Sequence, residues 1–305
     1  MDLTVRNGNQ LKGATGTFRL TLKAYLELMK LRIVLLLCFT TVTTMVIAAG
    51  GLPELGILLP TLLGGIFAAG GSSAINQYID RDMDSAMTRT ARRPIPSGRI
   101  APINALLFGV ALNIWSVLIL TIWVNPLTAL MAFLGAVYYV VVYTMLLKRN
   151  TVVNILIGGG AGAFPVLVGW AAVTGVITYE AGLLFAIVFW WTPPHSWALA
   201  LLVNADYARA NVPMMPVARG ERVTRLQIVL YSVQLLLITL LPVLFGVLGA
   251  IYFLAALSLG IGLVYMSVRL LQNTSKAMAR TTYKYSTAYL AFLFLAMIFD
   301  RLLIA

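Results

Sequence analysis

The charged side chains of this sequence are concentrated between residues 76 and 99, where the chain reads NQYIDRDMDSAMTRTARRPIPSGR. This stretch holds three of the ten acidic residues and five of the twenty-two basic residues, in a chain that is 60% hydrophobic. Asn76, Asp80 and Asp84 are four residues apart, so a helix would place them on one face, one turn after another. Asp82 would point to another side of the same helix.

Carboxylates that share one helix face repel each other unless a cation lies between them. Carboxylate and amide oxygens suit Mg²⁺, which takes one or two protein carboxylates and leaves its other positions to water and phosphate oxygens. The arginines that follow, in a loop enforced by Pro94, Pro96 and Gly98, offer bidentate donors for phosphate. The pattern indicates a magnesium site beside a diphosphate site. The alternative is that these charges solvate a helix end and that the arginines only set membrane topology.

The elements that carry these residues are membrane helices. Only 10% of the residues are charged, and apolar runs of about 20 residues, long enough to cross the hydrocarbon core, recur from residue 31 onward. A β-barrel would instead show short alternating segments. The basic residues behind the net charge of +12 lie between the apolar runs, so we expect no nucleic-acid partner. The prediction is a single all-α membrane domain over residues 1–305.

Nine membrane-spanning helices are predicted, after a polar lead-in at residues 1–30 whose amphipathic helix extends over 17–32. The predicted spans are 31–50, 56–75, 102–123, 126–147, 152–176, 181–203, 226–246, 248–270 and 286–304. With a cytoplasmic N-terminus, 21 of the 22 Lys and Arg residues lie on the inner side, as the positive-inside rule requires. The C-terminus then lies outside, where Asp300 and Arg301 are expected to form an interfacial pair. The long, charged inner connections are expected to hold the active site.

Three stretches resemble a known family. NQYIDRDMD followed by RTARRPIPSGR resembles the first aspartate-rich motif of the UbiA-type intramembrane prenyltransferases. Residues 143–170 (YTMLLKRNTVVNILIGGGAGAFPVLVGW) and 191–217 (WTPPHSWALALLVNADYARANVPMMPV) resemble the haem O synthase branch of that family, the protohaem IX farnesyltransferases. Family members that act on aromatic rings usually carry a second motif with two or more aspartates, whereas Asp206 stands alone here.

The resemblance implies an enzyme that transfers the farnesyl group of farnesyl diphosphate to a vinyl group of haem b, giving haem O and diphosphate. Haem b is then a substrate and Mg²⁺ the cofactor that assists ionisation of the allylic diphosphate. The implied magnesium ligands are Asn76, Asp80 and Asp84. The implied diphosphate contacts are Arg89, Arg93, Lys148 and Arg149.

Several further polar residues are candidates for supporting roles. His195 is the only histidine, next to a break in the sixth span at Pro193, and is expected either to contact haem or to be a satisfied structural residue. Asp206 and Arg209, at the end of that span, either contact the metal, orient Lys148 or are merely solvated. Tyr143 is expected at the inner membrane boundary, and Asn154 either orients a phosphate or bonds a neighbouring helix.

Two other functions remain open from the residues alone. One is prenylation of a quinone precursor or another aromatic acceptor, and the less favoured one is transport of an organic anion without chemistry. The expected location is a bacterial cytoplasmic (inner) membrane, with multiple passes and a cytoplasmic active site. The expected partners, besides the two substrates, are membrane lipid and a downstream haem-modifying enzyme.

Overall fold

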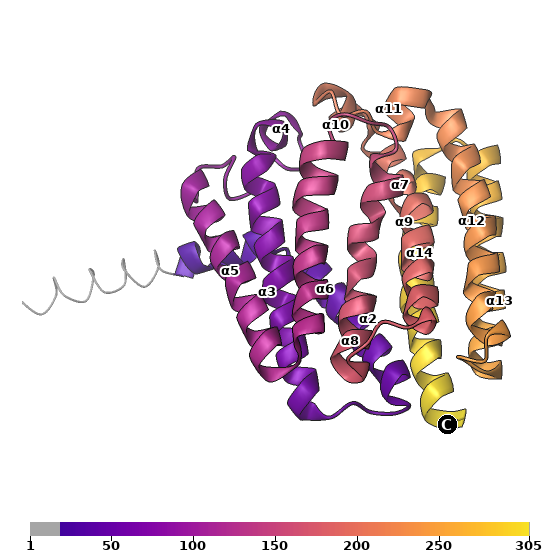
Figure 1. Ribbon diagram of the computed structural model, residues 1–305. Helices are drawn as coiled ribbons and strands as arrows, with labels where there is room; N and C mark the ends of the chain where they lie inside the picture. The colour runs from indigo at the N-terminus through magenta and orange to yellow at the C-terminus, as the bar shows by residue number, and fades with distance from the viewer. Residues whose placement is uncertain (1–18, 305) are drawn as a thin grey trace, which may run out of the picture.

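The apolar runs of the sequence form long helices, because a helix satisfies its backbone N–H and C=O groups within one segment in hydrocarbon. The computed structural model describes residues 19–304, and no residue in this range is assigned to a β-strand (Figure 1). The all-α prediction is confirmed for this part of the chain. Residues 19–29 are helical and lead into the first span; residues 17 and 18 of the predicted lead-in helix lie outside the described residues.

The long helical segments follow the predicted order. They are α2 (Leu31–Ala49), α3 (Leu55–Ile79), α5 (Pro102–Trp123), α6 (Pro126–Val137) continued by the π-helix η1 (Tyr138–Leu147), α7 (Asn154–Gly158) continued by the 3₁₀-helix η2 (Gly159–Ala163) and α8 (Phe164–Thr174), α9 (Tyr179–Leu202), α12 (Glu221–Leu244), α13 (Ala250–Gln272) and α14 (Lys276–Ile304). Three short helices lie between them, namely α4 (Arg81–Ala86), α10 (Asn204–Arg209) and α11 (Met215–Arg219).

Eight of the helical segments in the described range are long and apolar enough to cross a membrane, one fewer than the nine predicted. The segment that is not among them is α9, which has 24 residues and occupies the place of the sixth predicted span. Its sequence WWTPPHSW lowers the mean hydropathy, because Trp, Pro and His are poorly hydrophobic. The multi-pass architecture is confirmed, and a membrane crossing by α9 stays a prediction.

Three helices extend beyond their predicted ends on the same side of the bundle. Helix α3 continues to Ile79 rather than ending at 75, α12 begins at Glu221 rather than 226, and α14 begins at Lys276 rather than 286. Hydropathy marks the hydrocarbon and not the helix end, so polar turns that project beyond the membrane are missed. In α3 this projection carries the predicted metal ligands out to the charged end of the bundle.

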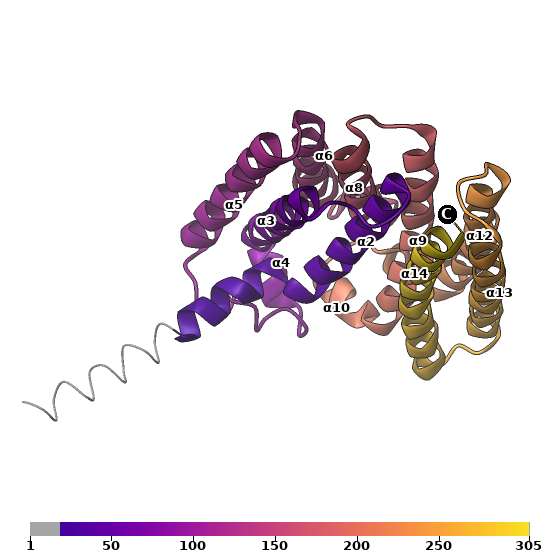
Figure 2. The same ribbon diagram turned by 90° about the horizontal axis from the view of Figure 1, so that it is seen from below.

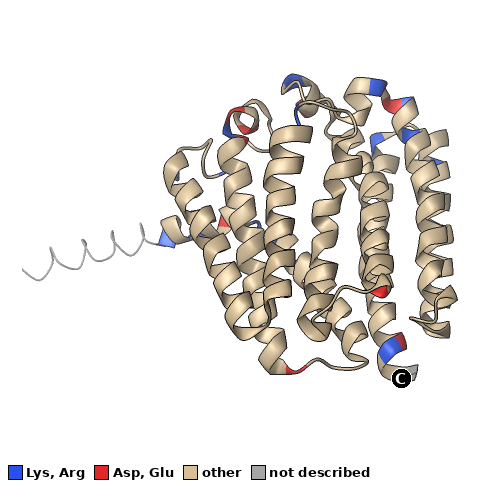
Figure 3. Cartoon of the chain, in the orientation of Figure 1, with Lys and Arg blue, Asp and Glu red and all other residues tan. Residues whose placement is uncertain are grey.

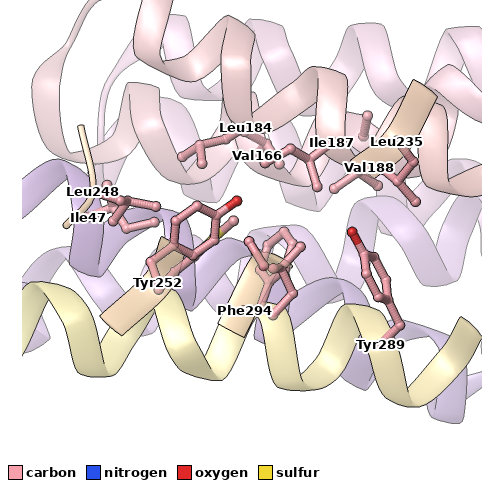
Figure 4. Packing of buried hydrophobic residues seen from close by; sticks show 14 of the residues in the cluster. Ile47, Val166, Leu184, Ile187, Val188, Leu235, Leu248, Tyr252, Tyr289 and Phe294 are labelled. Atoms are coloured by element: carbon pink, nitrogen blue, oxygen red, sulfur yellow. The ribbon is translucent and has the colours of Figure 1, made fainter. Parts of the chain in front are cut away.

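The bundle packs through small residues and one large apolar cluster. Helices α3 and α5 approach closely at Gly71 and Gly109, where a Cβ on Gly71 would lie 2.7 Å from the Gly109 carbonyl oxygen. The main cluster joins α2, α8, α9, α12, α13 and α14, and Figure 4 shows Tyr252, Tyr289 and Phe294 packed among its aliphatic side chains. Seen from below, α5 lies at one side of the bundle and α12 and α13 at the other (Figure 2).

Charged residues gather at one end of the bundle, around α4, α10 and α11, and are sparse along the helices (Figure 3). We call this the inner end and the opposite one, which carries the last turn of α14, the outer end. Large apolar side chains are exposed along the bundle sides, among them Leu36, Leu107, Leu237 and Phe292. Such a surface suits lipid contact and not water.

Candidate active site

The chain from Asn76 to Asp84 keeps a nearly helical course across the junction of α3 and α4. Asp80 is the junction residue, with φ −87° and ψ 5°, and the Asp84 amide donates a hydrogen bond to the Asp80 carbonyl at 2.7 Å. Asn76, Asp80 and Asp84 are therefore all buried on one face. The side chain of Asp82 is 65% exposed on another side.

A polar cavity of about 130 Å³ opens beside this face at the inner end. Its lining comes from five parts of the chain and is mostly basic and aromatic. The lining residues are Lys30, Asn76, Met83, Asp84, Met87, Arg89, Arg93, Tyr139, Tyr143, Lys148 and Tyr207. The volume is below the roughly 300 to 1,000 Å³ of pockets for drug-sized ligands, so it suits a compact charged group and not a porphyrin.

Asp80 lies directly behind the cavity wall. Its side chain is completely buried, and Oδ2 accepts hydrogen bonds from Nζ of Lys148 and, at 2.8 Å, from Nδ2 of Asn76. Burial lowers the pKa of Lys148, although the charge of Asp80 acts in the opposite direction. Asn154 is also buried, and its side-chain amide donates a hydrogen bond to the backbone carbonyl of Lys148 at 3.4 Å. Asn154 therefore contacts the main chain of a residue that lines the cavity.

Asp84 is paired with Arg93 at the cavity. The Arg93 guanidinium donates to Oδ2 of Asp84 at 2.6 Å, and the Asp84 carbonyl accepts a hydrogen bond from the Thr90 hydroxyl at 2.9 Å. The loop after α4 is thus folded back onto the helix face that carries the carboxylates. Arg89, from the same loop, also lines the cavity.

Lys30 completes the site and was not singled out from the sequence. It adopts the left-handed conformation, φ 52°, between the lead-in helix and α2, and its Nζ lies 3.3 Å from Oδ1 of Asn76. Burial, together with the charges of Arg93 and Lys148, lowers the pKa of Lys30 to about 7. In the sequence it is one basic residue among several at a membrane edge, so only the fold reveals its position.

Arg149 is directed away from the cavity. Its guanidinium forms a bidentate pair with Asp82, with both N···O distances at 2.7 Å, and a longer contact of 3.5 Å with Oδ1 of Asp80. The hydrogen bonds from Arg149 lower the pKa of Asp82 to about 2. Of the four predicted diphosphate contacts, Arg89, Arg93 and Lys148 line the cavity and Arg149 does not.

Asp206 links two loops at the inner end. Its Oδ2 accepts a hydrogen bond from the Arg89 backbone amide at 3.3 Å, and its Oδ1 pairs with Arg209 at 3.1 Å. Arg209 also donates to the Thr88 hydroxyl at 2.9 Å. These contacts hold the loop that carries Arg89 against α10, which also places Tyr207 in the cavity wall.

His195 lies outside this cavity, between α9 and α14. Its ring stacks on Trp191 with centroids 4.2 Å apart and lies 4.7 Å from the Tyr283 ring. Nδ1 is 2.8 Å from the Ser286 hydroxyl oxygen, which donates its own hydrogen to the Tyr283 carbonyl at 2.8 Å. A neutral His195 must therefore carry its proton on Nδ1, which leaves Nε2 as the ring nitrogen with a free electron pair.

The oxygen donors beside the cavity fit Mg²⁺. Two buried carboxylates and one buried amide lie on this helix face. A softer metal would call for His or Cys ligands, whereas Mg²⁺ binds through one or two carboxylates plus water and phosphate oxygens. Asn76, Asp80 and Asp84 are the residues that could hold it.

The sequence and the helical bundle have counterparts in known proteins. Residues 36–298 match the model of the UbiA prenyltransferase family. The chain belongs to this family. The UbiA match includes every candidate site residue named from the sequence, and of the cavity lining only Lys30 precedes it.

Two bacterial relatives illustrate the similarity. The chain is 53% identical over 284 residues to the protein named protoheme IX farnesyltransferase of Roseiflexus castenholzii, covering 93% of this chain and 53% of that protein. It is 50% identical over 278 residues to the protein of the same name from Symbiobacterium thermophilum, covering 90% and 93%. The chain thus spans about half the length of some relatives and nearly the whole of others.

Solved structures share the fold at low sequence identity. A digeranylgeranylglyceryl phosphate synthase has a TM-score of 0.77 at 19% identity, covering 92% of this chain and 98% of that one. A UbiA homologue from Archaeoglobus fulgidus, solved bound to DMAPP and Mg²⁺, has a TM-score of 0.65 at 17% identity, covering 90% and 98%.

Proposed function

We propose that this chain transfers the farnesyl group of farnesyl diphosphate to a vinyl carbon of haem b, releasing diphosphate and giving haem O. The observation that carries the proposal is the inner cavity, where buried Asp80 and Asp84 meet Lys30, Arg93 and Lys148. The name shared by relatives of about 50% identity supports the choice of substrates. The Archaeoglobus homologue, solved with a prenyl diphosphate and Mg²⁺, supports the diphosphate site.

In the proposed reaction the allylic C–O bond breaks and diphosphate departs with the electron pair. A bound Mg²⁺, held by Asn76, Asp80 and Asp84, would supply charge neutralisation for this leaving group. Arg93 contributes fixed positive charge on the same side, and Lys30 and Lys148 contribute hydrogen-bond donors, in a partly dry site where electrostatic stabilisation is strong. Arg89 is exposed at the cavity mouth and would contact the diphosphate from the loop.

The farnesyl chain must be shielded from water once its C1 carries positive charge. Tyr139 and Tyr143 form the aromatic wall of the cavity, stacked with ring centroids 5.7 Å apart. Aromatic faces of this kind stabilise a nearby cation. The haem vinyl group then attacks C1, and water adds to the other vinyl carbon and loses a proton, which leaves a hydroxyl group on the porphyrin side chain.

His195 is proposed to bind haem b on the acceptor side. Its Nε2 is the free Lewis base of the neutral ring, and the stack between Trp191 and Tyr283 holds the ring plane. A histidine nitrogen with this tautomer is the form that ligates haem iron. Replacement of His195 by Ala should change the absorption spectrum of bound haem, and an unchanged spectrum would argue against axial ligation.

The membrane arrangement completes the proposal. We propose nine spans, with α9 as the sixth, in one prenyltransferase domain over residues 1–305. The concentration of Lys and Arg at one end of the bundle supports a cytoplasmic active site (Figure 3), and the bacterial relatives support a bacterial inner membrane. Membrane lipid around the bundle and a downstream enzyme that modifies haem O are the proposed partners.

The proposal is tested with the full chain purified in detergent. The protein is incubated with farnesyl diphosphate, haem b and Mg²⁺, and products are analysed by mass spectrometry. Farnesylated haem of the haem O mass is the expected product, and chelation of divalent cations should abolish it. Product with 4-hydroxybenzoate but none with haem would favour an aromatic-acceptor prenyltransferase, and the absence of any prenylated product would favour a carrier.

A further inference from the structure

The side chain of Asn76 is held by a partner that takes no part in the proposed chemistry. Its Nδ2 donates to Oδ2 of Asp80 at 2.8 Å and to the hydroxyl oxygen of Thr144 at 3.1 Å. Its Oδ1 accepts from Nζ of Lys30 at 3.3 Å. Thr144 is completely buried, and neither the motif around Asn76 nor the cavity lining includes it.

The chemistry of these partners determines which way the Asn76 amide points. An ionised Asp80 carboxylate can only accept a hydrogen bond, and Nζ of Lys30 lies at the other end of the amide. The amide oxygen must therefore face Lys30 and the cavity, with the amide nitrogen facing Asp80. The Thr144 hydroxyl gives its hydrogen to the Tyr139 carbonyl at 2.8 Å, which leaves its oxygen free to accept from Asn76.

Thr144 reaches Asn76 because η1 is a π-helix. Its hydroxyl bonds the carbonyl five residues back, whereas the hydroxyls of Thr40, Thr43 and Thr44 in α2 bond the carbonyl four residues back. The backbone has the same wide register, since the Lys148 amide donates to the Tyr143 carbonyl at 2.8 Å. Segments with this register are rare and are frequently found at functional sites.

The wide register changes which residues share a side of the helix. In an α-helix Tyr139 and Lys148 would lie about 180° apart around the axis. At about 4.4 residues per turn, they lie only about 20° apart. Both line the cavity, and Thr144 lies on the neighbouring side that faces Asn76. Thr144 and Lys148 are four residues apart and share a side in either register, so the π-helix adds Tyr139 to the side that they occupy.

We infer that Thr144 is a positioning residue for the cation site: its hydroxyl holds the Asn76 amide so that Oδ1 is presented to the cavity. This inference rests on the proposed function, because it assumes that Asn76 contributes to binding a divalent cation. Removal of the hydroxyl leaves Nδ2 with one acceptor instead of two and allows the amide to turn. Partners that orient metal ligands typically contribute about 10- to 100-fold in metal affinity.

The test measures Mn²⁺ binding to the purified full chain with inorganic diphosphate, by the loss of the free Mn²⁺ signal in electron paramagnetic resonance. Thr144→Val should weaken binding about tenfold, and Thr144→Ser, which keeps the hydroxyl, should restore it to within about twofold. Thr43→Val is the matched control, because Thr43 is equally buried and its hydroxyl bonds a carbonyl of its own helix. It should bind Mn²⁺ as the unchanged protein does.

Each outcome has one meaning. Mn²⁺ affinity unchanged in Thr144→Val, with binding lost in Asp80→Asn, overturns the role of Thr144 and leaves the proposed function intact. Unchanged binding in Asp80→Asn overturns the metal site itself. If Thr144→Val does not fold, Thr144→Ala gives the same comparison without a second branch on Cβ. In an Asn76→Ala background, Thr144→Val should not weaken Mn²⁺ binding further. A further loss of Mn²⁺ affinity as large as that in the unchanged protein would contradict the inference.

Discussion

Buried aspartates lie at both ends of the bundle, and their partners differ. At the inner end Asp80 is bound by the side chains of Lys148 and Asn76, beside a cavity. At the outer end Asp300, 3% exposed, accepts hydrogen bonds from the backbone amides of Gly249 and Tyr252 at 2.5 and 3.1 Å. The carboxylate of Asp80 accepts hydrogen bonds from side chains. The carboxylate of Asp300 accepts them from backbone amides.

Asp300 caps the N-terminus of α13. Helix α13 begins at Ala250, and the residue before it is Gly249, which has no side chain to accept from the first turn. Asp300 of α14 supplies that carboxylate from another helix. The prediction of an interfacial pair with Arg301 was therefore wrong for Asp300. A buried carboxylate indicates chemistry only where its partners are side chains that a ligand can replace.

The largest expected effect separates the two ends. Asp80→Asn should lower the rate of farnesyl transfer by about 100- to 1,000-fold. The variant would lose a ligand of the Mg²⁺ ion that is proposed to neutralise the departing diphosphate. The apparent unfolding midpoint in detergent should change little, since an amide still accepts from Lys148. The readouts are product formation by mass spectrometry and thermal unfolding of the same preparation. Full activity in this variant would contradict the metal role of Asp80.

Asp300→Ala should show the opposite pattern. Loss of the cap leaves two backbone amides at the start of α13 without their acceptor, which costs about 2 kcal/mol and should lower the unfolding midpoint by several degrees. The rate at saturating substrate should stay within about twofold of the unchanged protein. A selective loss of activity without loss of stability would break the distinction between the two ends.

Lys30→Met should weaken binding of the diphosphate group about tenfold, through loss of one charge-assisted hydrogen bond. The measurement is inhibition of the reaction by inorganic diphosphate, or the KM for farnesyl diphosphate. Lys23→Met, on an exposed position of the lead-in helix, is the control and should behave like the unchanged protein. Equal effects of both variants would indicate a general surface charge and not a contact in the cavity.

Asp82→Asn should have the smallest effect, about threefold or less on the rate. Asp82 is two residues from Asp80 but exposed and paired with Arg149 outside the cavity. The measurement is the rate of farnesyl transfer by Asp82→Asn and by Asp80→Asn, which compares two nearby carboxylates on different helix faces. If Asp82→Asn were as inactive as Asp80→Asn, the division of this stretch into two faces would be wrong.

The sequence by itself determined the class of fold and one face of the site. Apolar runs of membrane length can only be helices, so the all-α multi-pass architecture followed from length and hydropathy. The spacing of Asn76, Asp80 and Asp84 determined their common face, because helical periodicity is a local property. The low hydropathy of the WWTPPHSW segment left the crossing of the membrane by α9 undecided.

Only the tertiary structure decided which distant residues meet that face. Lys30 lies 46 residues before Asn76 and enters the cavity through a left-handed residue at a helix junction. Tyr139 lies on the same side as Lys148 because η1 has the π register, and helical periodicity read from the sequence assumes the α register. Arg149, adjacent to Lys148 in the chain, is turned outward to Asp82. Contacts of this kind depend on helix packing, which no local pattern encodes.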